Sequence, residues 1–189
     1  MLNIEDFQLR ELKQQDLAQV LIWRNSDRVR SNMYSDNIIA QDEHQAWYNR
    51  IKSDTSQKHL IFEYRSRAVG LTYFTNMNDQ NRKCEWGFYI GETDLPRGCG
   101  TILGYLSLNY IFGTERITEV YGEVLDFNKR SQKLFLRLGF TEDGLKKERY
   151  MRNNQYHSVT TFTLLRSRWI DVERRRTEQL AIKRQYANV

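Results

Sequence analysis

A glycine-rich run at residues 95–101 carries the clearest chemical signal in this chain. Gly98 and Gly100 stand two apart, after a strand-like segment and directly before a helical pattern. Glycine adopts backbone dihedrals that a side chain forbids, so successive N–H groups can converge there on a phosphate at the positive end of the helix. The run therefore predicts an anion site, and a pyrophosphate is the ligand that we expect.

A carboxylate lies on the strand-like segment before this loop. Glu85 is a candidate general base for a ligand bound near the loop, directly or through water. The alternation of apolar and polar residues around Cys84 and Trp86 equally allows Glu85 to be a solvent-facing residue of a half-exposed strand. Both interpretations stay open at this point.

A second group of chemistry-bearing residues lies in the first quarter of the chain. Guanidinium groups bind diphosphates through paired, charge-assisted hydrogen bonds, and aromatic faces suit a base or a sugar ring. The candidates for binding such a ligand are Trp23, Arg24, Asn25, Arg28, Arg30, Met33, His44 and Trp47. Each has a structural alternative, because tryptophans on amphipathic helices often belong to the core and a histidine one turn away often only donates a hydrogen bond.

Short alternating elements must position these residues. Apolar periodicity predicts strands at residues 7–12, 60–64, 69–74, 84–90, 117–125, 145–151 and 157–165. It predicts helices at residues 16–25, 42–53, 101–112 and from 128 to before Gly139. Turns are expected near Ser66 and at residues 78–81 and 153–154. A sheet with helices on both faces, an α/β or α+β mixture, is the packing that this order favours.

Composition limits the class of protein. The 189 residues are 40 % hydrophobic and 13 % aromatic, which suits one globular unit. No apolar run approaches the roughly 20 residues that cross a bilayer, and the first residues lack a signal pattern, so we expect a cytoplasmic protein without a membrane partner. The two cysteines, Cys84 and Cys99, form no CxxC or Cys/His cluster, so no metal site is expected.

The net charge of +5 favours anionic partners. Much of the excess lies in residues 166–189, where a run of charge can equally be the solvated face of a helix. Nucleic-acid binding is not expected, because the chain lacks a recognisable reading motif or an aromatic stacking platform.

The element order and two motifs resemble the GCN5-related N-acetyltransferase (GNAT) superfamily over residues 5–166. The family's phosphate loop reads Gln/Arg-x-x-Gly-x-Gly/Ala, and Gly98 and Gly100 match it with Leu95 in the first slot. Residues 128–140 resemble the family's Asn-x-x-Ser/Ala…Leu-Tyr-x-x-x-Gly-Phe stretch. The resemblance implies a mixed sheet with strands splayed around a cofactor, in a domain of residues 1–168 followed by a basic helical tail of residues 169–189.

The resemblance also implies acetyl-CoA as co-substrate and no metal. Strand backbone would pair with pantetheine, loop amides would take the pyrophosphate, and an N–H near Phe88 or Tyr89 would polarise the thioester carbonyl. Glu85 would then be the base. The implied cofactor-binding residues are Phe88, Tyr89, Ile90, Arg97, Gly98, Cys99, Gly100, Thr101, Asn128, Ser131 and Phe135.

Two of these positions keep alternatives. Asn128 can hydrogen-bond pantetheine, or it can cap the helix that begins there. Phe135 stands where many family members carry a tyrosine that protonates the departing thiolate, and phenylalanine has no proton to give. The thiolate leaves unassisted, since a thiol has a pKa of about 8.5, or water or a hydroxyl such as Tyr121 substitutes, or the activity has been lost.

A narrower likeness points to the acceptor. Trp23-Arg-Asn25, Arg30-x-x-Met33, His44-x-x-Trp47 and the segment 84–89 together resemble the acetyltransferases of pseudaminic acid biosynthesis. These enzymes acetylate the 4-amino group of a UDP-linked amino-dideoxy sugar used in flagellin glycosylation. The likeness implies a small-molecule UDP-amino sugar as partner, and a homodimer is compatible with it.

Two further interpretations of the protein's function compete with this one. An acetyltransferase of polyamines or of protein N-termini shares the Trp-Arg-Asn region and the loops, although a polyamine site would need clustered carboxylates where residues 23–30 are rich in arginine. The other interpretation is a catalytically silent acyl-CoA-binding module, because Phe135 cannot protonate the departing thiolate.

Overall fold

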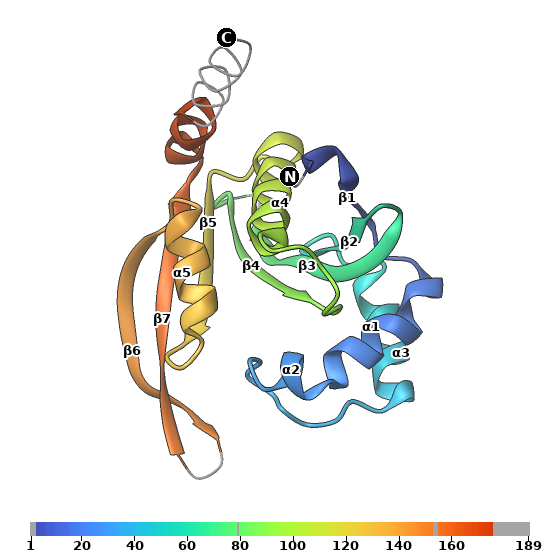
Figure 1. The fold of residues 1–189 in the computed structure, drawn as a ribbon. Helices are drawn as coiled ribbons and strands as arrows, with labels where there is room; N and C mark the ends of the chain where they lie inside the picture. Colours follow the sequence, from blue (N-terminus) through green and yellow to red (C-terminus); the bar gives the residue numbers. More distant parts are fainter. Residues whose placement is uncertain (1–2, 79, 153–154, 176–189) are drawn as a thin grey trace.

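One mixed sheet organises the molecule (Figure 1). The computed structural model describes residues 3–78, 80–152 and 155–175, and in this part seven strands follow the order β1-β2-β3-β4-β5-β7-β6. The strands are β1 (Phe7–Glu11), β2 (Lys58–Tyr64), β3 (Arg67–Asn78), β4 (Lys83–Ile90), β5 (Glu119–Leu125), β6 (Thr141–Arg152) and β7 (Gln155–Leu165). All neighbouring pairs are antiparallel except β4 and β5, which are parallel. The expected α/β fold with a mixed sheet is confirmed.

Helices cover both faces of the sheet. They are α1 (Leu17–Asn25), α2 (Asp27–Arg30), α3 (Gln41–Ile51), α4 (Cys99–Thr114) and α5 (Lys129–Arg137), with short 3-10 turns η1 (Ile4–Asp6) and η2 (Gln14–Asp16). Because neighbouring residues of a strand point to opposite faces, Leu71 and Tyr89 pack under α1 with Val20. Phe74 and Trp86 point the other way and pack with Leu108 of α4 and with α5. The sheet therefore separates an α1–α3 face from an α4–α5 face.

The parallel strands β4 and β5 pair only at their beginnings. Their register covers Lys83–Glu119, Cys84–Val120 and Glu85–Tyr121, and it stops there, so the strands diverge (Figure 1). A Cβ at Gly122 would lie 2.6 Å from the ring of Phe135 and 3.3 Å from the Trp86 carbonyl oxygen. The glycine thus lets the α5 aromatic ring pack directly where the strands separate.

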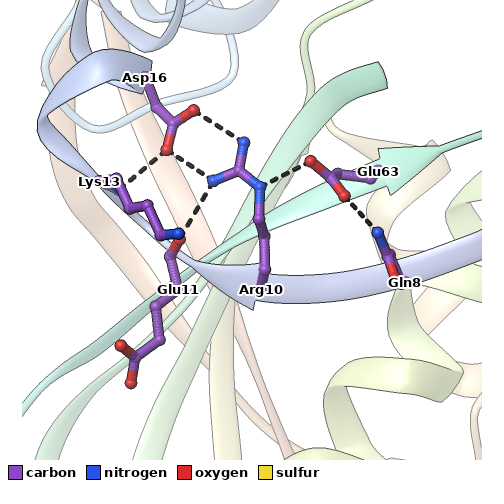
Figure 2. Close-up of polar contacts among 6 residues, drawn as sticks. All are labelled: Gln8, Arg10, Glu11, Lys13, Asp16 and Glu63. Atoms are coloured by element: carbon purple, nitrogen blue, oxygen red, sulfur yellow. Dashed lines mark hydrogen bonds and ion pairs between the residues drawn. The ribbon is translucent and has the colours of Figure 1, made fainter. Parts of the chain in front are cut away.

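A buried ion-pair network anchors the first strand (Figure 2). Arg10 donates to both carboxylate oxygens of Asp16, at 2.7 and 2.8 Å, and to Glu63 at 2.6 Å. Asp16 and Glu63 are only 7 % and 6 % exposed. Burial disfavours the Asp16 carboxylate, but the hydrogen bonds from Arg10 and from the Lys13 N–H outweigh it, so the pKa of Asp16 lies below its usual value. The network ties β1, β2 and the start of α1 together.

A helix at residues 166–175 follows β7 and packs on the domain. Trp169 is 2 % exposed, belongs to the main core and donates its indole N–H to Asn109 at 2.9 Å. The expected boundary between residues 168 and 169 therefore falls within this helix. Residues 176–189 of the expected tail lie outside the described residues. In the described part, no helix is long and apolar enough to cross a membrane.

The structure differs from the expected elements mainly at their ends. Strands β3 and β6 are longer than expected, and α2 is a helix that the sequence pattern did not indicate, because four residues are too few to show a helical period. Residue 79 of one expected turn and residues 153–154 of the other lie outside the described part of the chain.

Candidate active site

The loop before α4 forms an open helix N-terminus. Gly98 is the N-cap with a φ of 101°, a left-handed conformation that favours glycine. Thr101 and Ile102 donate their N–H groups back to the Gly98 carbonyl, at 2.9 and 3.2 Å. Within the described residues, the N–H groups of Cys99 and Gly100 donate to no backbone carbonyl. The positive end of α4 thus offers free donors, as an anion site needs.

The side chains around this loop offer few groups that could contact an anion. Cys99 is 3 % exposed, its Sγ donates to the Pro96 carbonyl at 2.9 Å, and burial raises the pKa of the thiol. Leu134 of α5 and Ile90 lie 3.8 and 3.9 Å from where a Cβ of Gly100 would be. Arg97 is exposed beside the loop. Of these, the residues that can meet a pyrophosphate are the loop amides and Arg97.

The register of β3 and β4 decides which backbone amides face the gap beside β5. The Gly91 N–H donates to the Val69 carbonyl at 2.8 Å, and Leu71 is opposite Tyr89. Hydrogen-bonded and non-hydrogen-bonded pairs alternate along antiparallel strands, so Tyr89 exchanges its bonds with β3, whereas the N–H of Phe88 points toward the gap. The sequence left either residue as the donor to the thioester carbonyl. The structure corrects this: the Tyr89 N–H is directed at β3, so Tyr89 is not the donor to the thioester carbonyl. Phe88 remains the candidate donor.

The Phe135 ring lies in an aromatic cluster on the α4–α5 face. It is 2 % exposed, with ring centroids 5.2 Å from Trp86, 6.2 Å from Phe88 and 5.1 Å from Phe162. The Tyr121 hydroxyl, which the sequence offered as a substitute acid, lies on the opposite face of the sheet, because its neighbour Gly122 faces Phe135. Tyr121 therefore does not replace a tyrosine in the Phe135 slot.

Glu85 is half-buried on the α1–α3 face, at the last pair before β4 and β5 separate. A β-bulge between Thr75 and Asn78 and a left-handed Asn76 bring the Asn76 amide to Glu85, with a distance of 3.1 Å. Burial and the nearby Glu123 carboxylate raise the pKa of Glu85, and the Asn76 hydrogen bond opposes them only in part. A carboxylate with a raised pKa beside the gap suits a general base better than a solvent-facing residue.

Glu123 is a second carboxylate on this face, and sequence reasoning missed it. Lys146 of β6 donates to one of its oxygens, and the Tyr34 hydroxyl donates to the other at 2.6 Å. Burial opposes ionisation of Glu123, but these donors keep its pKa below the usual value. The signal was available, because Glu123 lies two residues beyond Tyr121 on a strand and so shares the face of Glu85.

A cavity of about 310 Å³ opens on the α1–α3 face, and its lining includes Thr75, which lies opposite Glu85 in the sheet. It brings together the predicted acceptor residues Arg24, Met33, His44 and Trp47 with the ring of Tyr89. The other lining residues are Val20, Ile39, Glu43, Arg50, Gln57, His59, Leu71, Tyr73 and Thr75. Rings follow one another along the wall, with centroid distances of 4.9 Å for His44–Trp47, 5.2 Å for Trp47–His59 and 5.7 Å for His59–Tyr73.

Two buried polar atoms of the lining residues lack a hydrogen-bond partner within the described part of the chain. Arg24 donates through Nη2 to the Ser35 carbonyl at 2.8 Å, but its Nη1 has none, and neither does Nδ1 of His59. An unsatisfied buried polar group costs about 1–3 kcal/mol. Nη1 is itself buried, so the Arg24 side chain must turn toward the cavity before a ligand there can accept its hydrogen bond and recover that cost.

The histidines of the wall are uncharged near neutral pH. Burial lowers the pKa of His59 to about 4, and burial also lowers the pKa of His44 despite its contact with the Leu17 carbonyl. The His44 Nε2 lies 3.1 Å from that carbonyl oxygen, and His44 is 6 % exposed. His44 thus has the structural role that the sequence left open, while its ring still lines the cavity.

Other predicted acceptor residues hold the site together from outside the cavity. Trp23 is 2 % exposed and donates to Glu92 at 2.8 Å, which places it in the core and corrects its assignment as a stacking platform for the acceptor. Asn25 exchanges two hydrogen bonds with the Ile39 backbone, both at 2.9 Å, and Arg30 donates to the Asp36 carbonyl at 2.8 Å. They fix the segment that carries Met33 and Tyr34.

Two remaining assignments concern the start of α5 and the α1–α2 corner. The Asn128 side chain accepts from the Ser131 N–H at 3.1 Å, so it caps the helix as the alternative interpretation proposed. Arg28 donates to the Gly91 carbonyl and so joins α2 to the end of β4.

No group of three or more His, Cys, Asp or Glu side chains in the described residues could hold a metal ion.

The family and the relatives of the chain agree with this architecture. The model of the acetyltransferase (GNAT) domain matches residues 6–141, and the chain belongs to this family. Spermidine N(1)-acetyltransferase of Escherichia coli K12 is 21 % identical over 170 residues, covering 90 % of this chain and 91 % of the relative. The putative ribosomal N-acetyltransferase YdaF of Bacillus subtilis is 24 % identical over 106 residues, covering 56 % of this chain and 58 % of its own length.

Solved structures agree on the fold. Spermidine N-acetyltransferase of Vibrio cholerae in complex with CoA and spermine superimposes with a TM-score of 0.83 at 23 % identity, covering 88 % of this chain and 99 % of that one. The chain is an acetyl-CoA-dependent N-acetyltransferase, so the alternative of a silent acyl-CoA-binding module is set aside. The narrower likeness to pseudaminic acid enzymes is not confirmed, and these relatives fit the polyamine alternative better.

Proposed function

We propose that this enzyme transfers the acetyl group of acetyl-CoA to a primary amine on a nucleotide-linked amino sugar. The observation that carries the proposal is Arg24, which has an unpartnered Nη1, in the lining of a cavity that also carries five aromatic rings. A diphosphate oxygen would satisfy this donor, and a ring would lie against the aromatic wall.

The charges of the cavity favour an acceptor that bears an anion. Glu43 is the only carboxylate among the described residues that line it, whereas Arg24 and Arg50 contribute two cations. A polyamine carries several ammonium groups, which arginines repel and which need clustered carboxylates. Glu85, which lies outside the cavity lining, accepts the proton of the reactive amine.

The chemistry follows from the residues around the gap. Glu85 takes a proton from the ammonium, directly or through water, and the neutral amine attacks the thioester carbonyl carbon. The Phe88 N–H donates to the carbonyl oxygen as negative charge develops there, a contribution of roughly 3–4 kcal/mol by analogy with other oxyanion sites. The C–S bond then breaks as the attacking nitrogen loses its second proton to water, and the thiolate leaves without an acid from the protein, because Phe135 has no proton to give and a thiol has a pKa of only about 8.5.

A polyamine is the second candidate acceptor, and the relatives favour it. Spermidine N-acetyltransferases cover most of this chain at 21–23 % identity. Glu85 and Glu123 lie on one face and could hold an ammonium chain, although Lys146 already pairs with Glu123. The two candidates therefore differ in whether Arg24 helps or hinders binding.

The release of CoA thiol from acetyl-CoA separates these acceptors. A UDP-linked 4-amino-4,6-dideoxy sugar, spermidine and a peptide with a free N-terminus would be compared at equal concentrations. We expect the highest kcat/KM with the UDP-sugar. Release with spermidine alone would overturn the proposal in favour of the second candidate, and release with the peptide alone would overturn both.

A further inference from the structure

A tyrosine side chain of β3 lies across β4, beside the point where β4 and β5 separate. Tyr73 of β3 is opposite Gly87 of β4, and its ring packs on the α1–α3 face of the sheet. A Cβ at Gly87 would lie 2.2 Å from Cζ, 2.4 Å from Cε2 and 2.4 Å from the hydroxyl oxygen of Tyr73. The Tyr73 ring therefore fills the space that a side chain at residue 87 would occupy.

This position lies within the row of β4 residues that faces the acceptor. Residues two apart on a strand share one face, so Glu85, Gly87 and Tyr89 follow one another along the α1–α3 face. Because Gly87 has no side chain, the Tyr73 hydroxyl takes the place between Glu85 and Tyr89. The residue after Gly87 is Phe88, whose N–H faces the gap. The hydroxyl thus lies on the acceptor side of the position where that N–H would hold the thioester carbonyl.

The Tyr73 hydroxyl is free to bind a ligand. It has no hydrogen-bond partner in the part of the chain that the structure describes, and Tyr73 lines the acceptor cavity. In the same part of the chain, the polar side-chain atoms that are fully buried without a partner are Nη1 of Arg24 and Nδ1 of His59, so the Tyr73 hydroxyl is open to the cavity. Burial of the ring and the Glu85 carboxylate raise the pKa of Tyr73, so the phenol keeps its proton at neutral pH.

We propose that Tyr73 is a catalytic residue whose hydroxyl oxygen accepts a hydrogen bond from the attacking nitrogen and so points its lone pair at the thioester carbonyl carbon. The phenol ring is held for this task, because it stacks on His59, with ring centroids 5.7 Å apart, and lies against Gly87 on its other side. A contact in a fixed orientation lowers the barrier to attack. Tyr73 itself gains and loses no proton. The proposal rests on acetyl transfer to an amine and not on which amine is the acceptor.

Thiol release from acetyl-CoA tests the role of the hydroxyl. The acceptor is whichever of the UDP-amino sugar, spermidine and the peptide gives the highest kcat/KM. We expect Tyr73→Phe to lower kcat/KM for this amine about tenfold, the size of one lost hydrogen bond. The KM for acetyl-CoA and the pH at which Glu85 ionises should not change. The matched control is Tyr110→Phe, whose ring stacks on Phe74 on the α4–α5 face, with centroids 6.4 Å apart, and it should behave as wild type.

A second variant tests the same contact from β4. The methyl group of Gly87→Ala would displace the Tyr73 ring, so we expect a loss of kcat/KM at least as large as in Tyr73→Phe. The double variant Gly87→Ala/Tyr73→Phe should be no slower than Gly87→Ala alone. Gly144→Ala, on β6 with Thr161 at 3.7 Å from its Cβ, is the control for a strand glycine. Urea unfolding identifies the variants that fold, and if Gly87→Ala does not, Tyr73→Phe decides alone.

Three results would overturn the proposal. The first is an unchanged kcat/KM in Tyr73→Phe. The second is a pair of losses that multiply in the double variant, because Tyr73 and Gly87 would then act separately. The third is a shift in the pH dependence of Tyr73→Phe, because Tyr73 would then act through the ionisation of Glu85 and not on the attacking nitrogen.

Discussion

Glu85 on β4 and Tyr121 on β5 are opposite each other in the sheet, and they are the last pair before the two strands diverge. This one position sets the geometry of the site. Beyond this pair, the Phe88 N–H faces the gap between the strands. Glu85 itself lies opposite Thr75 of β3, and Thr75 and Tyr73 line the cavity on the α1–α3 face. In the proposed reaction, the acetyl donor and the amine acceptor would meet where the sheet opens.

Replacing Glu85 tests the proton transfer. We expect Glu85→Gln to lower kcat/KM by about 10²–10³-fold, because general bases contribute about 10²–10⁴-fold. The pKa of Glu85 is raised, so wild-type activity should increase with pH through a value above the usual 4.5. The variant should lose this acidic limb of the pH profile. Glu142→Gln, at an exposed position of β6, is the control. An unchanged profile in Glu85→Gln would remove the base from the account.

Gly98, the N-cap of α4, and Gly113, within the helix, together test the phosphate loop. Gly98→Ala should raise the KM for acetyl-CoA and destabilise the fold by about 1–2 kcal/mol, because an L side chain is strained at a φ of 101°. Gly113→Ala, later in α4 with nothing within 4 Å of its Cβ, should leave KM unchanged and stabilise the helix by about 0.5–1 kcal/mol. Steady-state kinetics and urea unfolding measure both. Equal KM values in the two variants would contradict a loop that binds through its backbone.

The Arg10 network makes stability depend on pH. The pKa of Asp16 is lowered in the folded state, so its contribution is present above the unfolded value of about 3.9 and disappears as pH falls through the folded value. Asp16→Asn should lower the free energy of unfolding at pH 7 by about 2–4 kcal/mol, because it leaves a half-buried Arg10 with one partner fewer. The wild type and the variant should converge at low pH. A constant difference down to about pH 2 would show that charge is not the cause.

Much of the fold was readable from the chain because its signals are local. The glycine loop and the run at residues 128–140 indicated where α4 and α5 begin, and strand alternation put Glu85 and Trp86 on opposite faces. The direction of the Tyr89 amide was not readable in this way. It depends on the register between β3 and β4, and a shift of one residue would reverse which amide faces the gap.

The acceptor side was predicted less well for a related reason. Trp23 and Arg24 are adjacent in a helix and point in different directions, and composition does not say which of them is buried and which lines the cavity. Glu123 acquires its role from Tyr34 and Lys146, which are 89 and 23 residues away in the chain. Such partners meet only in the folded structure.

The most direct test of the proposed acceptor is the KM of Arg24→Ala for the two candidate amines. If Arg24 binds a diphosphate, this variant should raise the KM for the UDP-amino sugar about 10- to 100-fold, since hydrogen bonds to charged groups contribute about 1.5–3 kcal/mol. The KM for acetyl-CoA should not change, and Arg130→Ala, exposed on α5, should behave as wild type. An unchanged KM for the UDP-amino sugar, together with a lower KM for spermidine, would contradict the account and favour a polyamine acceptor.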